Sequence, residues 1–344
     1  MTTVPRPYTA RVITPLVDTH GRVHTDLRIS VTDRCNFRCT YCMPVEGMEW
    51  LPRRELLTFE EIERVARVMV ERLGIRSIRL TGGEPTLRAH LPVLLGKLAA
   101  LRGADGTPIE LSMTTNGATL AHQAHELAAA GLDRINISLD TLRGDRFVEL
   151  TQRDDLDRVL AGIAAAVEAG FSRVKLNCVV MAGVNVDEVV DLARFGRDAG
   201  VEVRFIEFMP LDADGRWERG SVVSQAEIVE RISHEFPLEA TERTHEPAHR
   251  FRYVDGRGHV GVIASVTQPF CSSCDRVRLG PEGGLRNCLF ALDETDLRGP
   301  VRSGSTDSEL ARLIAANVSA KWAGHQIGQV QFIRPRKSMS QIGG

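Results

Sequence analysis

The sequence predicts an α/β protein built around a parallel β-sheet. From about residue 26, short β-branched runs alternate with helical stretches, and this alternation builds such a sheet. The chain has 344 residues, enough for one large α/β domain or two smaller ones. Polar and glycine-containing motifs follow several expected strands, where an α/β sheet places its ligands. An open doubly wound sheet and an incomplete (β/α) barrel both fit, and periodicity does not choose between them.

Runs of aliphatic and β-branched residues mark the expected strands. In chain order they are Leu27–Val31, Ile75–Leu80, Ile109–Thr114, Arg134–Leu139, Val174–Val180 and Val201–Phe208. Helices are expected between them, near residues 58–73, 88–101, 118–130, 155–169 and 186–199. The first helix is the best marked, because Thr58 and Glu61 form a capping box and Gly74 follows its last apolar position.

The pattern changes near residue 210. Ser224 with Glu227, and Thr306 with Glu309, each predict the start of a helix. We expect a loose N-terminal leader, a main α/β region and a C-terminal region that bears a second group of cysteines. Their predicted bounds are 1–22, 23–235 and 236–344.

A hairpin is predicted between Arg250–Val254 and Val260–Val266. Gly256, Gly258 and Gly261 lie between and within these runs as G-x-G-x-x-G. A dinucleotide-binding fingerprint requires a helix after such glycines, and none is expected here. The glycines are therefore interpreted as part of a hairpin turn.

Charge and hydropathy exclude several classes of protein. The chain has 43 Lys and Arg against 45 Asp and Glu, a net charge of −2, which argues against a nucleic-acid coat or a polybasic membrane binder. No apolar run approaches the roughly 20 residues of a membrane span, and the first 22 residues lack the apolar centre of a signal peptide. We expect a cytoplasmic protein with neither nucleic acid nor membrane as a partner.

Three cysteines follow the first expected strand directly. Cys35, Cys39 and Cys42 have the spacing C-x3-C-x2-C. Three thiolates on one loop hold three irons of a 4Fe–4S cluster and leave the fourth iron open to a small ligand. A structural zinc site would need a fourth ligand, for which His24 is a weak candidate. The spacing therefore favours a reactive iron–sulfur cluster.

A second group of cysteines lies near the C-terminus. Cys271, Cys274 and Cys288 have the spacing C-x2-C-x13-C, which fits a second 4Fe–4S cluster or a zinc site about equally well. Arg276 and Arg278 follow at once, and residues two apart in an extended segment point the same way. Guanidinium groups bind phosphate oxygens bidentately, so the pair indicates an anion pocket beside the metal site. The seventh cysteine, Cys178, is expected to pack as a small hydrophobic residue in a strand.

The first motif resembles that of the radical S-adenosylmethionine (SAM) superfamily. Tyr41 precedes the third cysteine, as it does there, and the run from Thr81 to Pro85 matches the superfamily's G-G-E-P motif. The two glycines permit a close backbone approach to a ligand at the end of a strand. The resemblance implies an incomplete (β/α)6-type radical SAM barrel whose open iron chelates SAM.

The C-terminal motifs narrow the resemblance to the GTP 3′,8-cyclase family. The run Ile263–Cys271, the C-x2-C-x13-C spacing and the arginine pair all match, and the similarity extends from about Asp26 to the C-terminus. This resemblance implies a lyase of molybdenum cofactor biosynthesis that uses two 4Fe–4S clusters and SAM. Its reaction would cyclise GTP to 3′,8-cyclo-7,8-dihydro-GTP, after a 5′-deoxyadenosyl radical removes the hydrogen at C3′.

The resemblance also implies roles for individual residues. Contacts to GTP are implied for Arg28, Arg79, Thr114, Lys175, Arg276, Val277 (through its backbone) and Arg278. Contacts to SAM are implied for Tyr41, Gly83, Ser138 and Met209. Catalytic roles are implied for Arg276, Arg278, Gly343 and Gly344, the two glycines being a tail that reaches into the active site. Most of these positions lie at the carboxyl ends of expected strands.

The implied partners are GTP, an electron donor and the next enzyme of the pathway, cyclic pyranopterin monophosphate synthase, which would receive the product. The protein itself would be a monomer or a homodimer. Two alternatives stay open: another radical SAM enzyme with an auxiliary cluster, such as a peptide modifier, and a non-enzymatic nucleotide-binding module stabilised by zinc. The peptide modifier does not account for Arg276, Arg278 or the Gly343-Gly344 tail.

Overall fold

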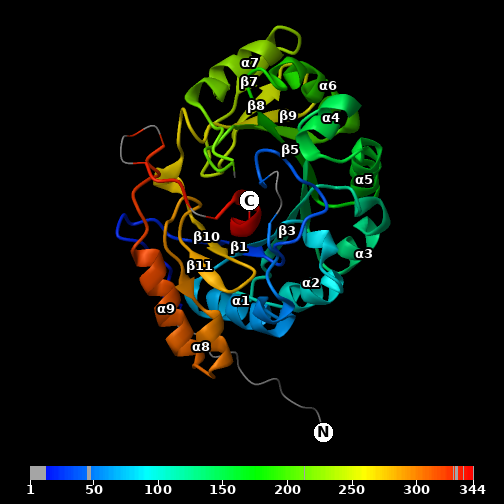
Figure 1. Ribbon diagram of the computed structural model, residues 1–344. Helices are drawn as coiled ribbons and strands as arrows, with labels where there is room; N and C mark the ends of the chain where they lie inside the picture. The colour runs from blue at the N-terminus through cyan, green and yellow to red at the C-terminus, as the bar shows by residue number, and fades with distance from the viewer. Residues whose placement is uncertain are drawn as a thin grey trace.

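A curved parallel sheet forms the body of the protein. The computed structural model describes residues 13–44, 48–212, 214–327, 329, 332–335 and 337–343. Six strands pair in chain order and all run parallel. They are β1 (Asp26–Ser30), β2 (Ser77–Thr81), β3 (Glu110–Thr115), β4 (Arg134–Ser138), β5 (Arg173–Val180) and β6 (Glu202–Glu207). Figure 1 shows this sheet curving into an open barrel with helices on its outer face, so the predicted incomplete barrel is confirmed.

The C-terminal region extends both edges of this sheet. Strand β10 (Arg276–Leu279) pairs parallel with β1, and β9 (His259–Ile263) pairs parallel with β6. Antiparallel strands follow outside them: β11 (Gly284–Arg286) and β12 (Thr295–Asp296) beside β10, and β8 (His249–Tyr253) and β7 (Leu238–Ala240) beside β9. Residues on both sides of the predicted boundary at 235 therefore share one sheet. The predicted hairpin is confirmed as β8 and β9.

Most expected helices form close to their predicted places. They are α1 (Phe59–Leu73), α2 (Leu91–Ala99), α5 (Leu156–Glu168) and α6 (Val189–Ala199), with α7 (Gln225–Ser233) and α9 (Asp307–Ser319) at the two later capping sites. The expected helix at 118–130 divides into a 3₁₀ turn and the short α3 (Ala124–Ala129). Helix α4 (Gly144–Thr151) was not predicted, because it begins at a glycine and its preceding residue, Arg143, makes no side-chain cap. The short helices α8 (Arg298–Arg302) and α10 (Met339–Ile342) were not predicted either.

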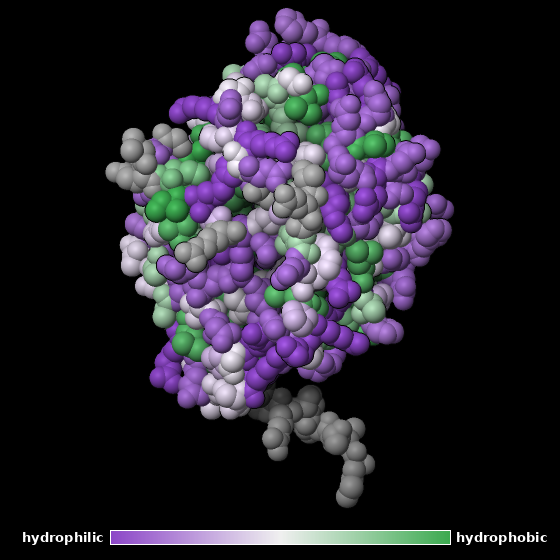
Figure 2. All heavy atoms as spheres, viewed as in Figure 1, coloured by the Kyte–Doolittle hydropathy of each residue, from purple (hydrophilic) through white to green (hydrophobic). Residues whose placement is uncertain are grey.

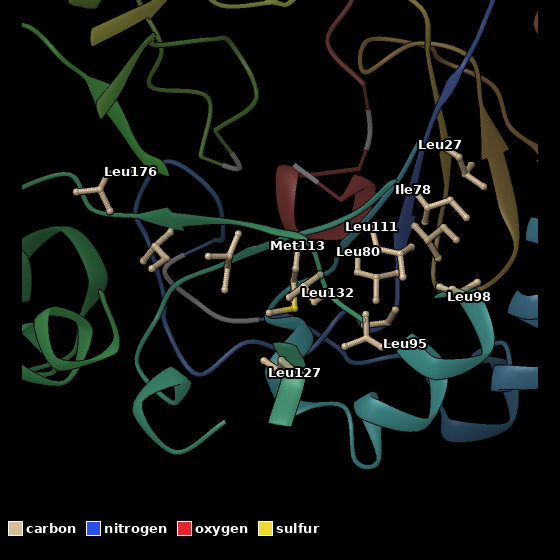
Figure 3. Packing of buried hydrophobic residues seen from close by; sticks show 14 of the residues in the cluster. Leu27, Ile78, Leu80, Leu95, Leu98, Leu111, Met113, Leu127, Leu132 and Leu176 are labelled. Carbon is tan, nitrogen blue, oxygen red and sulfur yellow. The ribbon is translucent and has the colours of Figure 1, made fainter. Parts of the chain in front are cut away.

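Alternate residues of the barrel strands face opposite environments. Figure 3 shows Leu27, Ile78, Leu80, Leu111 and Met113 directed toward leucines of α2 and α3, where they are almost fully buried. On each of the six strands β1 to β6, a polar or basic residue alternates with apolar neighbours. These residues are Arg28, Arg79, Ser112, Asn136, Lys175 and Arg204. Strands of a parallel sheet are usually apolar on both faces. The polar inner row therefore indicates that the barrel encloses a binding cavity.

The described part of the expected leader is held against the body. Leu16 is buried, and Asp18 accepts a 2.6 Å hydrogen bond from Nε of Arg22. Arg22 also donates to the carbonyl oxygens of Cys271, at 2.7 Å, and Ala323, at 2.9 Å. Residues 13–22 are therefore fixed by their own hydrogen bonds, and residues 1–12 lie outside the described ranges.

The outer surface is polar. Figure 2 shows a mainly hydrophilic face on which hydrophobic residues are scattered in small groups. Within the described ranges, no helix combines the length and apolar character needed to cross a bilayer.

The packing of α5 against the turn after β3 provides a test of the fold. A side chain at Gly162 would overlap the carbonyl oxygen of Gly117, whereas a side chain at the exposed Gly96 of α2 would meet nothing within 4 Å. We expect Gly162→Ala to lower the free energy of unfolding by about 1–3 kcal/mol through overpacking. Gly96→Ala should raise it by about 0.5–1 kcal/mol through helix propensity. Urea denaturation of both variants measures the difference, and two equal midpoints would contradict the packing described.

Candidate active site

The curved sheet encloses a cavity of about 340 Å³. All six cysteines of the two groups line it, which brings together residues far apart in the sequence. The first group follows the carboxyl end of β1, and Cys271 and Cys274 precede the amino end of β10. Because β1 and β10 are adjacent and parallel, with Asp26 opposite Arg276, the two groups lie at opposite ends of this strand pair.

The first cysteine group consists of free, half-buried cysteines. Burial raises the pKa of Cys35 to about 11 and that of Cys42 to about 12. Burial, together with the charge of Cys42, also raises the pKa of Cys39 well above its ordinary value. A bound metal cluster would supply the positive charge that keeps such thiolates ionised. This donor set therefore fits a cluster with one open iron.

The two glycines after β2 join the turn there to the cysteine loop. The backbone N–H of Gly83 donates to the carbonyl of Thr32 at 2.7 Å, and the N–H of Glu84 donates to that of Arg34 at 2.7 Å. A Cβ at Gly82 would lie 2.7 Å from the Thr32 oxygen, and one at Gly83 would overlap the backbone of Arg34. The glycines are thus required by contact with a neighbouring loop, a reason that the sequence did not reveal.

The four residues expected to contact SAM all line the cavity, beside the first cysteine group. They are Tyr41, Gly83, Ser138 and Met209. The hydroxyl of Tyr41 donates to Asp140 at 2.5 Å, and the other oxygen of this carboxylate accepts from the backbone of Val179 at 2.8 Å. Burial raises the pKa of Asp140 to about 6. Asp140 therefore fixes the ring of Tyr41 at the cavity wall.

The second cysteine group lies among cations. Burial would raise the pKa of the Cys274 thiol, but the charges of Arg276 and Lys321 outweigh it and lower the pKa to about 6. Two nitrogens of Arg276 donate to Cys274 Sγ, each at 3.4 Å. Burial raises the pKa of Cys288. Three free thiols at one end of the cavity, one of them already inclined to ionise, fit a second cluster.

His24, considered above as a zinc ligand for the first group, lies instead beside the second. Its Nε2 is 3.0 Å from Lys321 Nζ, which itself contacts Cys274. Within the described part of the chain, no three His, Cys, Asp or Glu side chains are grouped so that they could hold a single metal ion. A cubane of four irons is larger than one ion and takes more widely spaced thiolates.

Four arginines converge between the two cysteine groups. Arg28, Arg79, Arg276 and Arg278 all line the cavity. Burial and the positive charges of its three neighbours lower the pKa of Arg28 well below its ordinary value. Its buried Nε has no hydrogen-bond partner among the residues that the structure describes. Burial and the charge of Arg276 also lower the pKa of Arg278 to about 10. Crowded buried cations are costly unless an anion joins them, so this arrangement is suited to a polyphosphate.

The other residues expected to bind GTP differ in placement. Thr114 lines the cavity, whereas the Val277 side chain is fully buried in the hydrophobic core. Lys175 is buried beside Arg204 and Glu246, with 3.9 Å between its Nζ and Glu246 Oε2. Burial and the charge of Arg204 lower the pKa of Lys175 to about 7.

The C-terminal tail enters the concave side of the sheet, as the red segment in Figure 1 shows. Nη1 of Arg278 donates to the carbonyl of Gly343. Gly343 has φ of +79°, and a Cβ there would lie 2.6 Å from Thr81 Oγ1 and 3.1 Å from Ser30 Cβ. The passage therefore admits a residue without a side chain. Gly344 lies outside the described residues.

Several residues of the site were not predicted from the sequence. Arg204 lines the cavity and donates to Glu246 at 2.5 Å, and Asp26 and Asp140 also line it. Arg204 could have been recognised from the sequence, because this basic residue stands between the apolar Val203 and Phe205 in an expected strand, and both of them are buried. Glu246 and Lys321 could not, because only the tertiary fold brings them near the cavity.

Comparisons with known proteins place the chain among its relatives. A family model described as "Radical SAM superfamily" matches residues 29–196, and one described as "Molybdenum Cofactor Synthesis C" matches residues 201–327. The GTP 3′,8-cyclase of Streptomyces coelicolor is 50% identical over 333 residues, covering 96% of this chain and 96% of that protein. The GTP 3′,8-cyclase of Corynebacterium glutamicum is 48% identical over 336 residues, covering 96% and 89%.

A solved structure has the same fold. Streptococcus suis SuiB bound to S-adenosylmethionine matches with a TM-score of 0.62 at 14% identity, covering 93% of this chain and 77% of that one. At this identity the likeness concerns the fold alone. The relatives above, in contrast, are similar over nearly the whole sequence. The chain belongs to the GTP 3′,8-cyclase family of the radical SAM superfamily.

Proposed function

We propose that this protein is a radical SAM lyase that cyclises GTP to 3′,8-cyclo-7,8-dihydro-GTP, the first step of molybdenum cofactor biosynthesis. One observation carries the proposal: four arginines, Arg278 buried and the others half-buried, line a cavity with a cysteine group at each end. A strand of five residues spans roughly 17 Å, which leaves space for a nucleotide between two clusters. Family membership supports the same reaction.

Each end of the cavity has a separate task. Cys35, Cys39 and Cys42 would hold the first 4Fe–4S cluster, to which SAM would bind. Cys271, Cys274 and Cys288 would hold the second. When bound, the first cluster and SAM supply the one-electron chemistry that removes a hydrogen atom from the substrate.

The chain's own residues bind and orient the two small molecules. Tyr41, Gly83, Ser138 and Met209 contact SAM at the end near the first cluster. Arg28, Arg79, Lys175, Arg276 and Arg278 hold the triphosphate of GTP, with Thr114 and the backbone of Val277 as further contacts. The C-terminal tail, which reaches Arg278 at Gly343, excludes water from the reacting groups. An electron donor serves the clusters, and the next enzyme of the pathway receives the product.

The decisive experiment measures SAM cleavage by the protein after anaerobic reconstitution with iron and sulfide. We expect 5′-deoxyadenosine formation to be stimulated by GTP and not by ATP, together with a new product of the same mass as GTP. Mass spectrometry detects both. Cleavage indifferent to GTP would favour a different radical SAM reaction. No cleavage by protein shown to contain its clusters would contradict the proposal.

The lowered pKa of Lys175 predicts that the affinity for GTP depends on pH. Its ammonium binds phosphate only when protonated, and its pKa is lowered to about 7. GTP affinity should therefore fall as pH rises from 7 to 8.5, by up to about tenfold per unit, because binding must then take up a proton. Anaerobic calorimetry without SAM measures this dependence. Lys175→Arg stays charged throughout and should lose most of it, so parallel profiles for the two proteins would contradict the assignment.

The narrow passage at Gly343 predicts a specific loss of turnover. In Gly343→Ala the new methyl group would displace the tail from Thr81 and break its bond with Arg278. We expect product formation to fall by about tenfold or more, since a misplaced positioning group costs on the order of 10²-fold. SAM binding should be retained. Gly304→Ala is the matched control, because Gly304 also has positive φ but nothing within 4 Å. An equal effect in both variants would show that backbone strain alone is responsible.

A further inference from the structure

Lys321, just beyond the end of α9, is directed into the loop that carries the second cysteine group. Its side chain is 3% exposed. Its Nζ donates to the carbonyl oxygens of Arg276 at 2.9 Å and Cys274 at 3.2 Å, and lies 3.6 Å from Cys274 Sγ. The ammonium thus holds the backbone at the cysteine and two residues after it, and also contacts the cysteine sulfur.

The partner of this ammonium on the other side is His24. An ammonium group can only donate hydrogen bonds, so His24 Nε2, at 3.0 Å, accepts and the imidazole is neutral. The carboxylate of Asp18, 3.6 Å from His24 Nε2, is bound by Nε of Arg22 at 2.6 Å. The sulfurs of Cys274 and Cys288 are the groups of opposite charge that act on this ammonium.

The chain segment around Lys321 is locked in place. Arg22 donates to the carbonyl oxygens of Trp322 at 2.5 Å and Ala323 at 2.9 Å, and also to that of Cys271 at 2.7 Å. One buried guanidinium therefore joins the segment after α9 to the cysteine loop. These hydrogen bonds hold the backbone after Lys321 against the cysteine loop, so the contact between Lys321 and Cys274 rests on a fixed backbone.

Arg276, the other cation at Cys274, has a second task. Its guanidinium donates to Cys274 Sγ, but it also lines the cavity where the triphosphate is proposed to bind. Substrate binding therefore changes the electrostatic field that Arg276 exerts on the sulfur. Lys321 does not line the cavity, so its charge acts on Cys274 independently of substrate.

We propose that Lys321 is a positioning residue of the second cluster, which fixes Cys274 and raises the reduction potential of that cluster. Reduction adds negative charge to the cluster, and a buried cation beside a ligating sulfur stabilises the reduced form. Arg22 and His24, from the N-terminal segment, hold the lysine at this place. The inference rests on the proposed function, because it needs a cluster on Cys271, Cys274 and Cys288.

The test isolates the second cluster. In a full-length protein with Cys35, Cys39 and Cys42 changed to Ala, anaerobic reconstitution leaves only the second cluster, whose midpoint potential is measured by redox titration followed by EPR. Iron content is measured in parallel. Lys321→Met and Lys321→Gln remove the charge, Lys321→Arg retains it, and Lys97→Met on the outer helix α2 is the matched control.

We expect the two neutral variants to hold their iron and to shift the midpoint to a more negative potential. Lys321→Arg should restore most of the shift, and Lys97→Met should leave the potential unchanged. If both neutral variants lose iron while Lys321→Arg retains it, the requirement for the charge is also supported. An unchanged midpoint in an iron-loaded neutral variant overturns the inference, and so does iron loss in all three Lys321 variants.

The outcome is distinguishable from failure of the proposed function. If the parent protein with Lys321 intact takes up no second cluster, the proposed function and this inference fall together. If that cluster forms and its potential does not respond to Lys321, only the inference fails. GTP takes no part in the measurement, so the result does not depend on turnover.

Discussion

The parallel pairing of β1 with β10 is the constraint on which the rest of the site depends. It joins residues about 250 positions apart in the chain, with Arg28 opposite Arg278. It also places one cysteine group beyond the carboxyl end of β1 and two cysteines of the other group before the amino end of β10. Without this pairing, each group would belong to a separate small metal loop. With it, both line one cavity, and the basic residues of the two strands lie between them.

Concentrated positive charge in the interior is the main energetic cost of this arrangement. Arg28, Arg79, Arg276 and Arg278 line one cavity, Arg278 buried and the others half-buried, in a protein whose net charge is −2. The structure offsets part of the cost locally: Asp26 lies near these arginines, and Glu246 pairs with Arg204. The rest is offset when an anion binds. The clustered charge therefore lowers the stability of the free protein and raises its affinity for a polyphosphate. Functional sites commonly combine these two effects.

Both described ends of the chain support the site, at different places. The N-terminal segment supplies Arg22 and His24 behind the second cysteine group. The C-terminal tail passes Thr81 and reaches Arg278 on the concave side of the sheet. Each contact joins segments that are more than 60 residues apart, so the site forms only once the sheet has closed around it. Local helix signals such as the capping box of α1 specify the outer layer, and these long-range contacts specify the inside.

Most strands and helices of the barrel, both cysteine groups and the arginine pair could be recognised in the amino-acid sequence, because the signals for them come from residues close together in the chain. The alternation of Leu27, Arg28 and Ile29 already separates an apolar outer face from a polar inner one. The three-dimensional structure was needed to show that the C-terminal region extends the same sheet, that His24 lies beside the second cysteine group, and that Glu246 and Lys321 lie beside the site. The physical reason is distance along the chain: periodicity and capping report contacts within a few residues, whereas these contacts depend on how the whole sheet curves and closes.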